Sequence, residues 1–133
     1  MVDLSPSRGV LHADHHDTKP ARYVALRGEA DGSTADHLQA ELRRLLAPSW
    51  LTVLRVDLSA LRFLNCAALS ALLTVRAAAT QCGQQLSITG ADGCPARVLA
   101  LTQADLVFGH PPLPGHPRTP LASPALNAAV GPA

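Results

Sequence analysis

Aromatic residues are scarce in this sequence, at 3% of 133 residues, although hydrophobic residues make up 47%. Surfaces that bind single-stranded nucleic acid stack bases on aromatic side chains, so this scarcity argues against such a surface. An excess of one charge sign is also lacking, because 11 basic and 10 acidic residues leave a net charge of +1. Such a surface exerts little long-range attraction on DNA or acidic lipid. We therefore expect neither a nucleic-acid partner nor a membrane partner.

Long apolar runs and paired cysteines are missing as well. No stretch approaches the about 18 uninterrupted apolar residues of a membrane span, and the opening residues MVDLSPSRGV lack the basic and apolar regions of a secretory signal. Cys66, Cys82 and Cys94 form no CxxC pair, which is the usual signature of a disulfide framework or a zinc site. The sequence thus predicts a cytoplasmic protein without a metal or other cofactor.

The length fits one domain, which we divide into three segments. Residues 1–20 are a polar N-terminal segment with an expected edge strand at 9–13. Residues 21–109 carry the folded domain. Residues 110–133 are a proline-rich tail, in which 123–129 favour a short final helix.

Strands and helices alternate within the folded domain. Stretches rich in strand-forming residues predict strands at 22–27, 51–58 and 86–89. Leucine and alanine at helical spacing predict helices at 35–46, 66–82 and 95–101. Residues 106–108 fit either a last strand or the exit of a helix. This alternation predicts parallel strands joined by crossovers, and so an α/β fold.

The ends of these elements carry recognisable signals. Asn65 is a good N-cap for the second helix, and Gly83 suits the position after its C-terminus. Residues 61–65 are expected to form a short link into that helix. Val98, Leu99 and Leu101 are expected on the inner face of the third helix.

Four segments in a fixed order resemble STAS domains of the anti-sigma factor antagonist type. They are 27–31 (RGEAD), 56–69 (VDLSALRFLNCAAL), 82–86 (CGQQL) and 98–108 (VLALTQADLVF). The resemblance implies a single STAS-like domain, with a small mixed β-sheet of about 4 strands covered by about 4 helices. It further implies a non-enzymatic regulator that docks an anti-sigma factor or a GHKL-type serine kinase.

In that family, phosphorylation of a serine at a helix start breaks the docking. The resemblance implies a partner-binding surface that combines a turn with this helix start: Gly28, Glu29, Ala30, Asp31, Asn65, Cys66, Ala67, Ala68 and Leu69. A helix N-terminus has unpaired N–H groups and partial positive charge, so it tolerates a phosphate.

This chain departs from the family at the phosphorylated position. Where relatives typically have Asp-Ser-Ser-Gly, with the modified hydroxyl second, it has Asn65-Cys66-Ala67-Ala68. Cys66 is therefore a degenerate phosphosite, and the nearest hydroxyls along the chain are Ser59 and Ser70. We expect docking without the usual phosphate control.

Two other functions stay open. A helix N-terminus favours a thiolate, so Cys66 suits a thiol-based redox sensor, although no resolving cysteine is adjacent in sequence. A scaffold or assembly STAS module is the other, and the oligomeric state, monomer or homodimer, stays open with it. Asp31 and Asp57 suit either local capping or partner contact. Adjacent His15 and His16 would point to opposite faces of a strand, which favours a solvated segment over a metal site.

Overall fold

The structure is a computed structural model that describes residues 2–3 and 11–110 of the chain. Its strands are β1 (Val2–Asp3), β2 (Leu11–Thr18), β3 (Ala21–Ala30), β4 (Val53–Leu64) and β5 (Gln85–Thr89). Its helices are α1 (Ala35–Leu45), α2 (Cys66–Gln81), α3 (Gly93–Thr102) and α4 (Ala104–Val107). The predicted helix at 123–129 lies outside the described residues.

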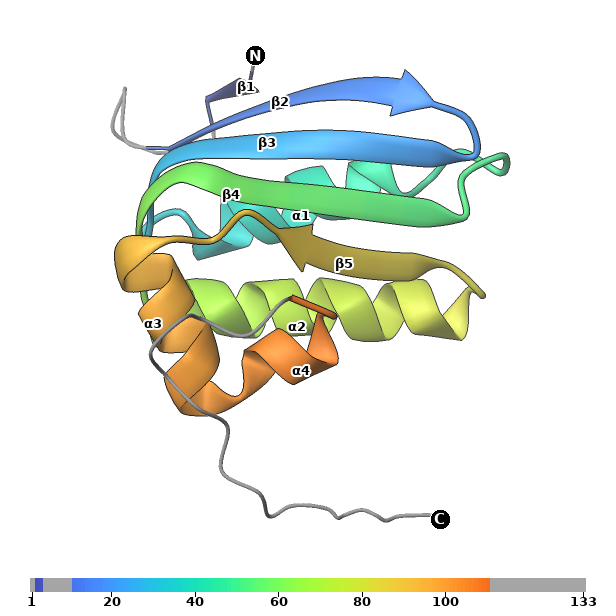
Figure 1. Cartoon of the computed structure of the whole chain (residues 1–133). Helices are drawn as coiled ribbons and strands as arrows, with labels where there is room; N and C mark the ends of the chain where they lie inside the picture. The colour runs from blue at the N-terminus through green and yellow to red at the C-terminus, as the bar shows by residue number, and fades with distance from the viewer. Residues whose placement is uncertain (1, 4–10, 111–133) are drawn as a thin grey trace, which may run out of the picture.

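The strands form one mixed sheet whose spatial order, β1-β2-β3-β4-β5, is also the order of the sequence. β2 is antiparallel to both β1 and β3, whereas β3, β4 and β5 are parallel to one another. Helices α1 and α2 make the two crossovers between the parallel strands (Figure 1). The predicted mixed α/β class is thus confirmed.

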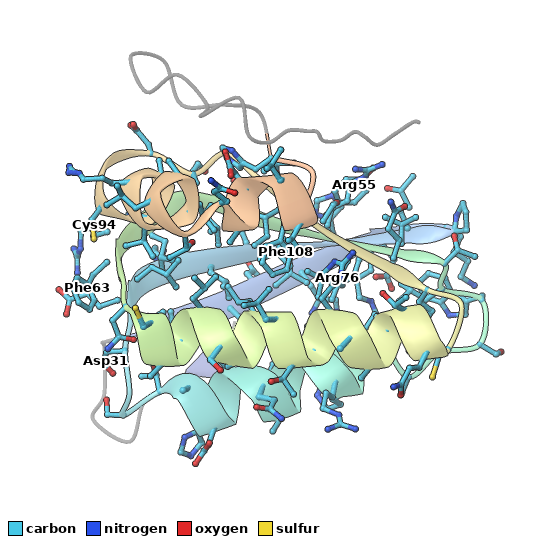
Figure 2. All side chains as sticks on the ribbon, turned by 90° about the horizontal axis from the view of Figure 1, so that it is seen from below. Asp31, Arg55, Phe63, Arg76, Cys94 and Phe108 are labelled. Atoms are coloured by element: carbon cyan, nitrogen blue, oxygen red, sulfur yellow. The ribbon has the colours of Figure 1, made fainter. Side chains whose placement is uncertain are left out.

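One face of the sheet carries the core. Along β3, Val24, Leu26 and Ala30 are buried, while the alternating residues Ala25 and Arg27 are exposed. The helices lie on the buried side (Figure 1; Figure 2), and α1 contributes Leu38, Leu42 and Leu45 to it. The opposite face is polar and exposed, as sheets with antiparallel strands often are.

Strands β2, β3, β4 and β5 are all longer than the sequence predicted, β3 by residues at both ends. β2 begins at Leu11 and continues to Thr18, because its polar residues pair with β3 on a sheet whose outer face meets solvent. β4 runs to Leu64 instead of ending near residue 58, and register shifts opposite Ala25–Arg27 and Gly28–Glu29 let its ladder with β3 continue. The segment predicted as a link at 61–65 is therefore mostly strand.

The C-terminal helices differ from prediction in which residues they bury. Leu99 is fully buried, but Leu101 is 76% exposed, so its predicted inward position is wrong. Gln103 has a left-handed backbone (φ 60°) that ends α3 and turns the chain into α4. Phe108 consequently enters the core, and its carbonyl accepts a hydrogen bond from Ile88 N at 3.2 Å. No described helix has the length and apolar character that a membrane crossing needs.

Candidate functional site

The start of α2 is held in place by the predicted N-cap. Asn65 follows directly on β4, and its side-chain Oδ1 accepts a hydrogen bond from Ala68 N at 3.0 Å. Its backbone N–H donates to Ala30 O at 3.2 Å, which ties the helix start to the end of β3. Cys66 and Ala67, the first two helical residues, are exposed to solvent.

The turn between β3 and α1 is fixed by the side chains of its own residues. Ser33 donates to Asp31 Oδ1 through its backbone N–H at 2.9 Å and through its hydroxyl at 2.7 Å. These bonds, the hydroxyl first, hold the pKa of the Asp31 carboxyl below its usual value. Thr34 is fully buried, and its Oγ1 accepts a hydrogen bond from Asp31 N at 3.0 Å. Thr34 stands at the N-cap position of α1, but its side chain closes the turn and makes no capping hydrogen bond to the helix.

This turn lies close to the start of α2. A Cβ placed on Gly32 would lie 3.9 Å from the Cβ of Ala67, an ordinary van der Waals contact. The two segments meet because parallel strands β3 and β4 end at the same edge of the sheet, where α/β folds commonly bind ligands.

Phe63 and Glu29 extend the same surface. They are direct partners in the β3–β4 ladder, and Phe63 is 39% exposed. Figure 2 shows Asp31, Phe63 and Cys94 together at one end of the molecule. We call the exposed residues here the α2-start surface: Glu29, Gly32, Ser33, Phe63, Cys66 and Ala67.

The residues that the sequence placed at a partner-binding surface fall into three groups by exposure. Glu29, Cys66 and Ala67 are exposed, and Asp31 and Asn65 are partly buried. The remaining residues are buried: Gly28, Ala30, Ala68 and Leu69. These four shape the backbone beneath the surface. Gly28 has a φ of 108°, a backbone conformation that glycine adopts readily because it has no Cβ.

Gly32, Ser33 and Phe63 are not among the residues that the sequence assigned to the partner-binding surface, although Gly32 and Ser33 lie in the expected docking turn, 28–34, and Phe63 lies in the motif at 56–69. Ser33 is distant in sequence from the α2 start, so only the fold brings its hydroxyl to this surface. Phe63 had a usable signal, since it is one of only two phenylalanines and stands between Arg62 and Leu64. The alternation of inward and outward side chains along a strand would not by itself have assigned the face of Phe63. Leu61 and Leu64 are both buried although they are three residues apart, because the pairing of β4 is irregular here.

The other candidate hydroxyls lie elsewhere. Ser59 is on β4, where its N–H and hydroxyl donate to the two carboxylate oxygens of Asp57 at 2.9 and 3.1 Å. The carboxylate of Asp57 is thus engaged in local hydrogen bonds within β4. Ser70 is exposed on α2, one turn beyond Cys66.

The three cysteines are free. Cys66 and Cys82 stand at opposite ends of α2, whereas Cys94 Sγ lies 4.0 Å from Leu64 O, near the α2 start. The fold therefore places a second thiol at the same end of the molecule as Cys66. Within residues 2–3 and 11–110, no group of three His, Cys, Asp or Glu side chains is arranged to hold a metal. His16 instead stacks on Tyr23, with ring centroids 5.1 Å apart.

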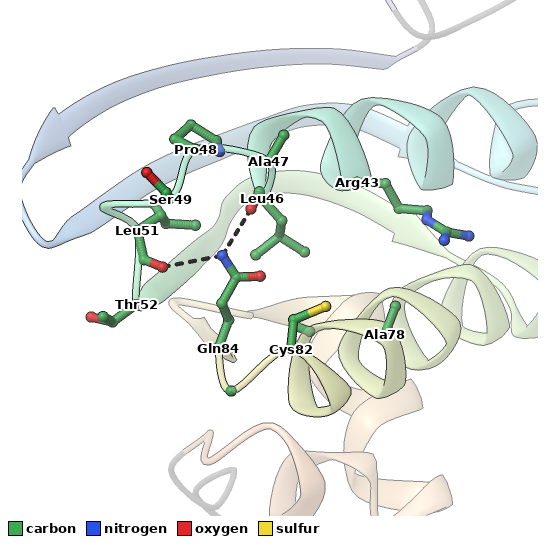
Figure 3. Close-up of a pocket in the computed structure, with 12 residues that line it drawn as sticks. Arg43, Leu46, Ala47, Pro48, Ser49, Leu51, Thr52, Ala78, Cys82 and Gln84 are labelled. Carbon is green, nitrogen blue, oxygen red and sulfur yellow. Dashed lines mark hydrogen bonds between the residues drawn. The ribbon is translucent and has the colours of Figure 1, made fainter.

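A hollow of about 470 Å³ lies at the opposite end of α2, beside the connection between α1 and β4 (Figure 3). Gln84 Nε2 donates to Leu46 O at 2.8 Å and to Leu51 O at 3.1 Å, which fastens this connection to the end of α2. Arg43 and Cys82 also line the hollow, but no acidic or histidine side chain among the described residues does.

Comparison with known proteins gives consistent matches. The family described as "Mlab, STAS domain" matches residues 15–108. The structure is similar to that of an anti-sigma factor antagonist from Mycobacterium paratuberculosis, with 25% sequence identity and a TM-score of 0.65 over 84% of this chain and 92% of that chain. No curated protein matches the chain.

Two more distant solved structures show the same fold. One is the anti-sigma factor antagonist SpoIIAA in its unphosphorylated form, at 10% identity and a TM-score of 0.64, covering 78% of this chain and 90% of that chain. The other is an antisigma-factor antagonist STAS domain from Rhodobacter sphaeroides, at 16% identity and a TM-score of 0.53, covering 63% and 90%. These matches confirm the resemblance drawn from the sequence.

Proposed function

Because the chain belongs to the STAS domain family, we propose that it is a cytoplasmic, non-enzymatic regulator that docks an anti-sigma factor or a related GHKL-type serine kinase. The docking site in this proposal is the α2-start surface. The observation that supports it is the hydrogen bond from Asn65 N to Ala30 O, which holds the start of α2 beside the end of β3 and brings two distant segments to one exposed surface. The similarity to anti-sigma factor antagonists supports the class of partner.

The physical properties of the surface suit protein docking. Its turn is closed by hydrogen bonds within the turn itself, so little conformational entropy is lost on binding. Phe63 offers an exposed aromatic anchor of the kind that dominates binding energy at interfaces. The backbone N–H groups of Cys66 and Ala67 belong to the first turn of α2 and have no intrahelical acceptor. A partner carboxylate or carbonyl can accept hydrogen bonds from them.

We further propose that docking is not controlled by phosphate at position 66. SpoIIAA, which shares the fold, exists in a phosphorylated form, but here Cys66 offers a thiol in place of a serine hydroxyl. Ser33 is the hydroxyl of the α2-start surface itself. After incubation with candidate kinases and ATP, mass spectrometry should find no phosphate on Cys66. A phosphate on Ser33, Ser59 or Ser70 would instead mean a displaced switch.

Two variants, each of which replaces one alanine of α2 by arginine, test the docking site. Ala67→Arg places a long charged side chain in the α2-start surface, whereas Ala77→Arg makes the same change at another exposed position, about 15 Å further along the helix. Isothermal titration against candidate anti-sigma factors should show binding weakened about tenfold or more by Ala67→Arg. Ala77→Arg should leave the affinity within about threefold of the parent.

Two results would count against the proposal. One is the absence of binding to every candidate by a protein that circular dichroism shows to be folded, which would remove the partner class. The other is an equal loss of affinity in both variants, which would keep a partner but move its site away from the start of α2.

A further inference from the structure

A second polar hollow, of about 530 Å³, lies along the outer edge of β5, between α2 and α4. We call it the β5-edge hollow and define it by six of its lining residues: Arg55, Arg76, Thr80, Leu86, Ser87 and Leu106. Figure 2 shows Arg55 and Arg76 near Phe108, away from Asp31 and Phe63 at the end of the molecule. The β5-edge hollow is thus separate from the α2-start surface.

No acidic side chain among residues 2–3 and 11–110 compensates the positive charge of this hollow. Arg55 comes from β4 and Arg76 from α2, so two different elements each contribute an arginine to the lining of the hollow. Within the described part of the chain, neither arginine has an ion-pair partner, and no acidic side chain lines the hollow. Arg55 Nη1 donates to Ser87 Oγ at 3.3 Å, which leaves its other donors available.

The edge of β5 adds a backbone donor. Gln85 N donates to Thr52 O beside β4, and Ile88 N donates outward to Phe108 O. Because successive N–H groups of a strand point to alternate sides, Leu86 N–H points outward as that of Ile88 does. Within the part of the chain that the structure describes, Leu86 N–H is the one outward donor of β5 that precedes Ile88, whose own N–H is bound to Phe108 O. One ladder position is too short to pair an added peptide strand, so the hollow favours a compact ligand.

An apolar wall completes the hollow. Leu106 is 56% exposed and Val107 is 42% exposed, and both line the side that α4 provides. The arrangement therefore joins a cationic part, with donors from Arg55, Arg76 and Leu86 N–H, to an apolar part of a few side chains.

We propose that the β5-edge hollow binds a small phosphate monoester that carries a compact apolar group. A phosphate monoester has a charge between −1.5 and −2 near neutral pH, which roughly matches two arginines. Guanidinium groups bind phosphate oxygens with paired, charge-assisted hydrogen bonds. The apolar group would rest against Leu106 and Val107. A volume of about 530 Å³ falls in the range of small-molecule sites.

Phenyl phosphate is a suitable probe, titrated at constant ionic strength by calorimetry and by NMR of the arginine side chains. We expect saturable binding, with the Nε–H signals of Arg55 and Arg76 shifting together. Arg55→Gln and Arg76→Gln should each weaken binding about tenfold or more, since each removes a charge-assisted contact. The matched control is Arg97→Gln, which changes an exposed arginine of α3 outside the hollow and should leave the affinity unchanged.

Inorganic phosphate should bind more weakly than phenyl phosphate, because it lacks the apolar group. Phenol should not bind, because it lacks the phosphate. Absence of saturable phenyl phosphate binding, or an equal effect of Arg97→Gln, would overturn the proposal. A phosphoserine peptide that binds more tightly than phenyl phosphate would also overturn it, in favour of a modified protein partner. None of these results depends on whether the α2-start surface binds an anti-sigma factor.

Discussion

Removing the side-chain cap of α2 should destabilise the fold by a measurable amount. In Asn65→Ala, the N–H of Ala68 loses its 3.0 Å acceptor. Loss of a helix N-cap typically costs about 0.5–2 kcal/mol. Ala68 is fully buried, so water does not readily replace the lost oxygen, and we expect a cost in the upper half, about 1–2 kcal/mol. Urea unfolding followed by circular dichroism should show a lower midpoint with an unchanged slope.

Asn65→Asp is the matched control. It keeps an oxygen at the capping position and adds a negative charge, which the partial positive charge of a helix N-terminus favours. Its midpoint at neutral pH should therefore equal or exceed that of the parent. The reasoning fails if Asn65→Ala loses less than about 0.3 kcal/mol, or if Asn65→Asp loses as much as Asn65→Ala.

Two further predictions concern local backbone and charge. Gly90→Ala should lower the free energy of unfolding by about 1–2 kcal/mol or more. Gly90 has a φ of +74°, and a Cβ at this position would collide with Asp57 Oδ1. An unchanged urea midpoint would contradict this prediction. The pKa of Asp31 is lowered in the folded state, chiefly by the Ser33 hydroxyl, so its carboxylate stabilises the fold above the unfolded pKa of about 3.9 and ceases to do so as pH falls through the folded pKa. The melting temperature of the parent should therefore exceed that of Asp31→Asn at pH 7, with the gap shrinking toward pH 3, whereas a gap independent of pH would refute the assignment.

Features that depend on neighbouring residues were well predicted from the sequence. Asn65 caps α2 as expected, and Gly83 follows its end with a φ of +75°. The parallel order of β3, β4 and β5 also followed from the alternation of strands and helices. The capping signals each lie within a few residues of the helix end, and the parallel order follows from the alternation of strands and helices along the chain.

Features that depend on distant pairing were missed. The His15–Asp17 segment is polar, and only its partner strand β3 makes it a strand. In α3 the prediction placed both Leu99 and Leu101 inward, although residues two apart on a helix point to nearly opposite sides, and Leu101 is therefore exposed. The left-handed residue Gln103 then redirects the chain into α4, and Phe108 enters the core.

The candidate site shows the same division between local and distant signals. Motif resemblance gave both segments of the α2-start surface, but it did not separate the residues that face solvent from those beneath them. Ala68 and Leu69 are part of the motif, yet both are buried. Ser33, outside the quoted motifs, is exposed beside them. Exposure depends on the packing of α1 and α2, which no single segment specifies.

The identity between strand order and sequence order has a consequence for synthesis of the chain. No strand has to enter between two that are already paired, so each one adds to the free edge left by its predecessor as it leaves the ribosome. The loops that close are those of single crossovers, and their entropic cost stays small. β5 is then the last edge to form, and the carbonyl of Phe108 is the group that ends its growth.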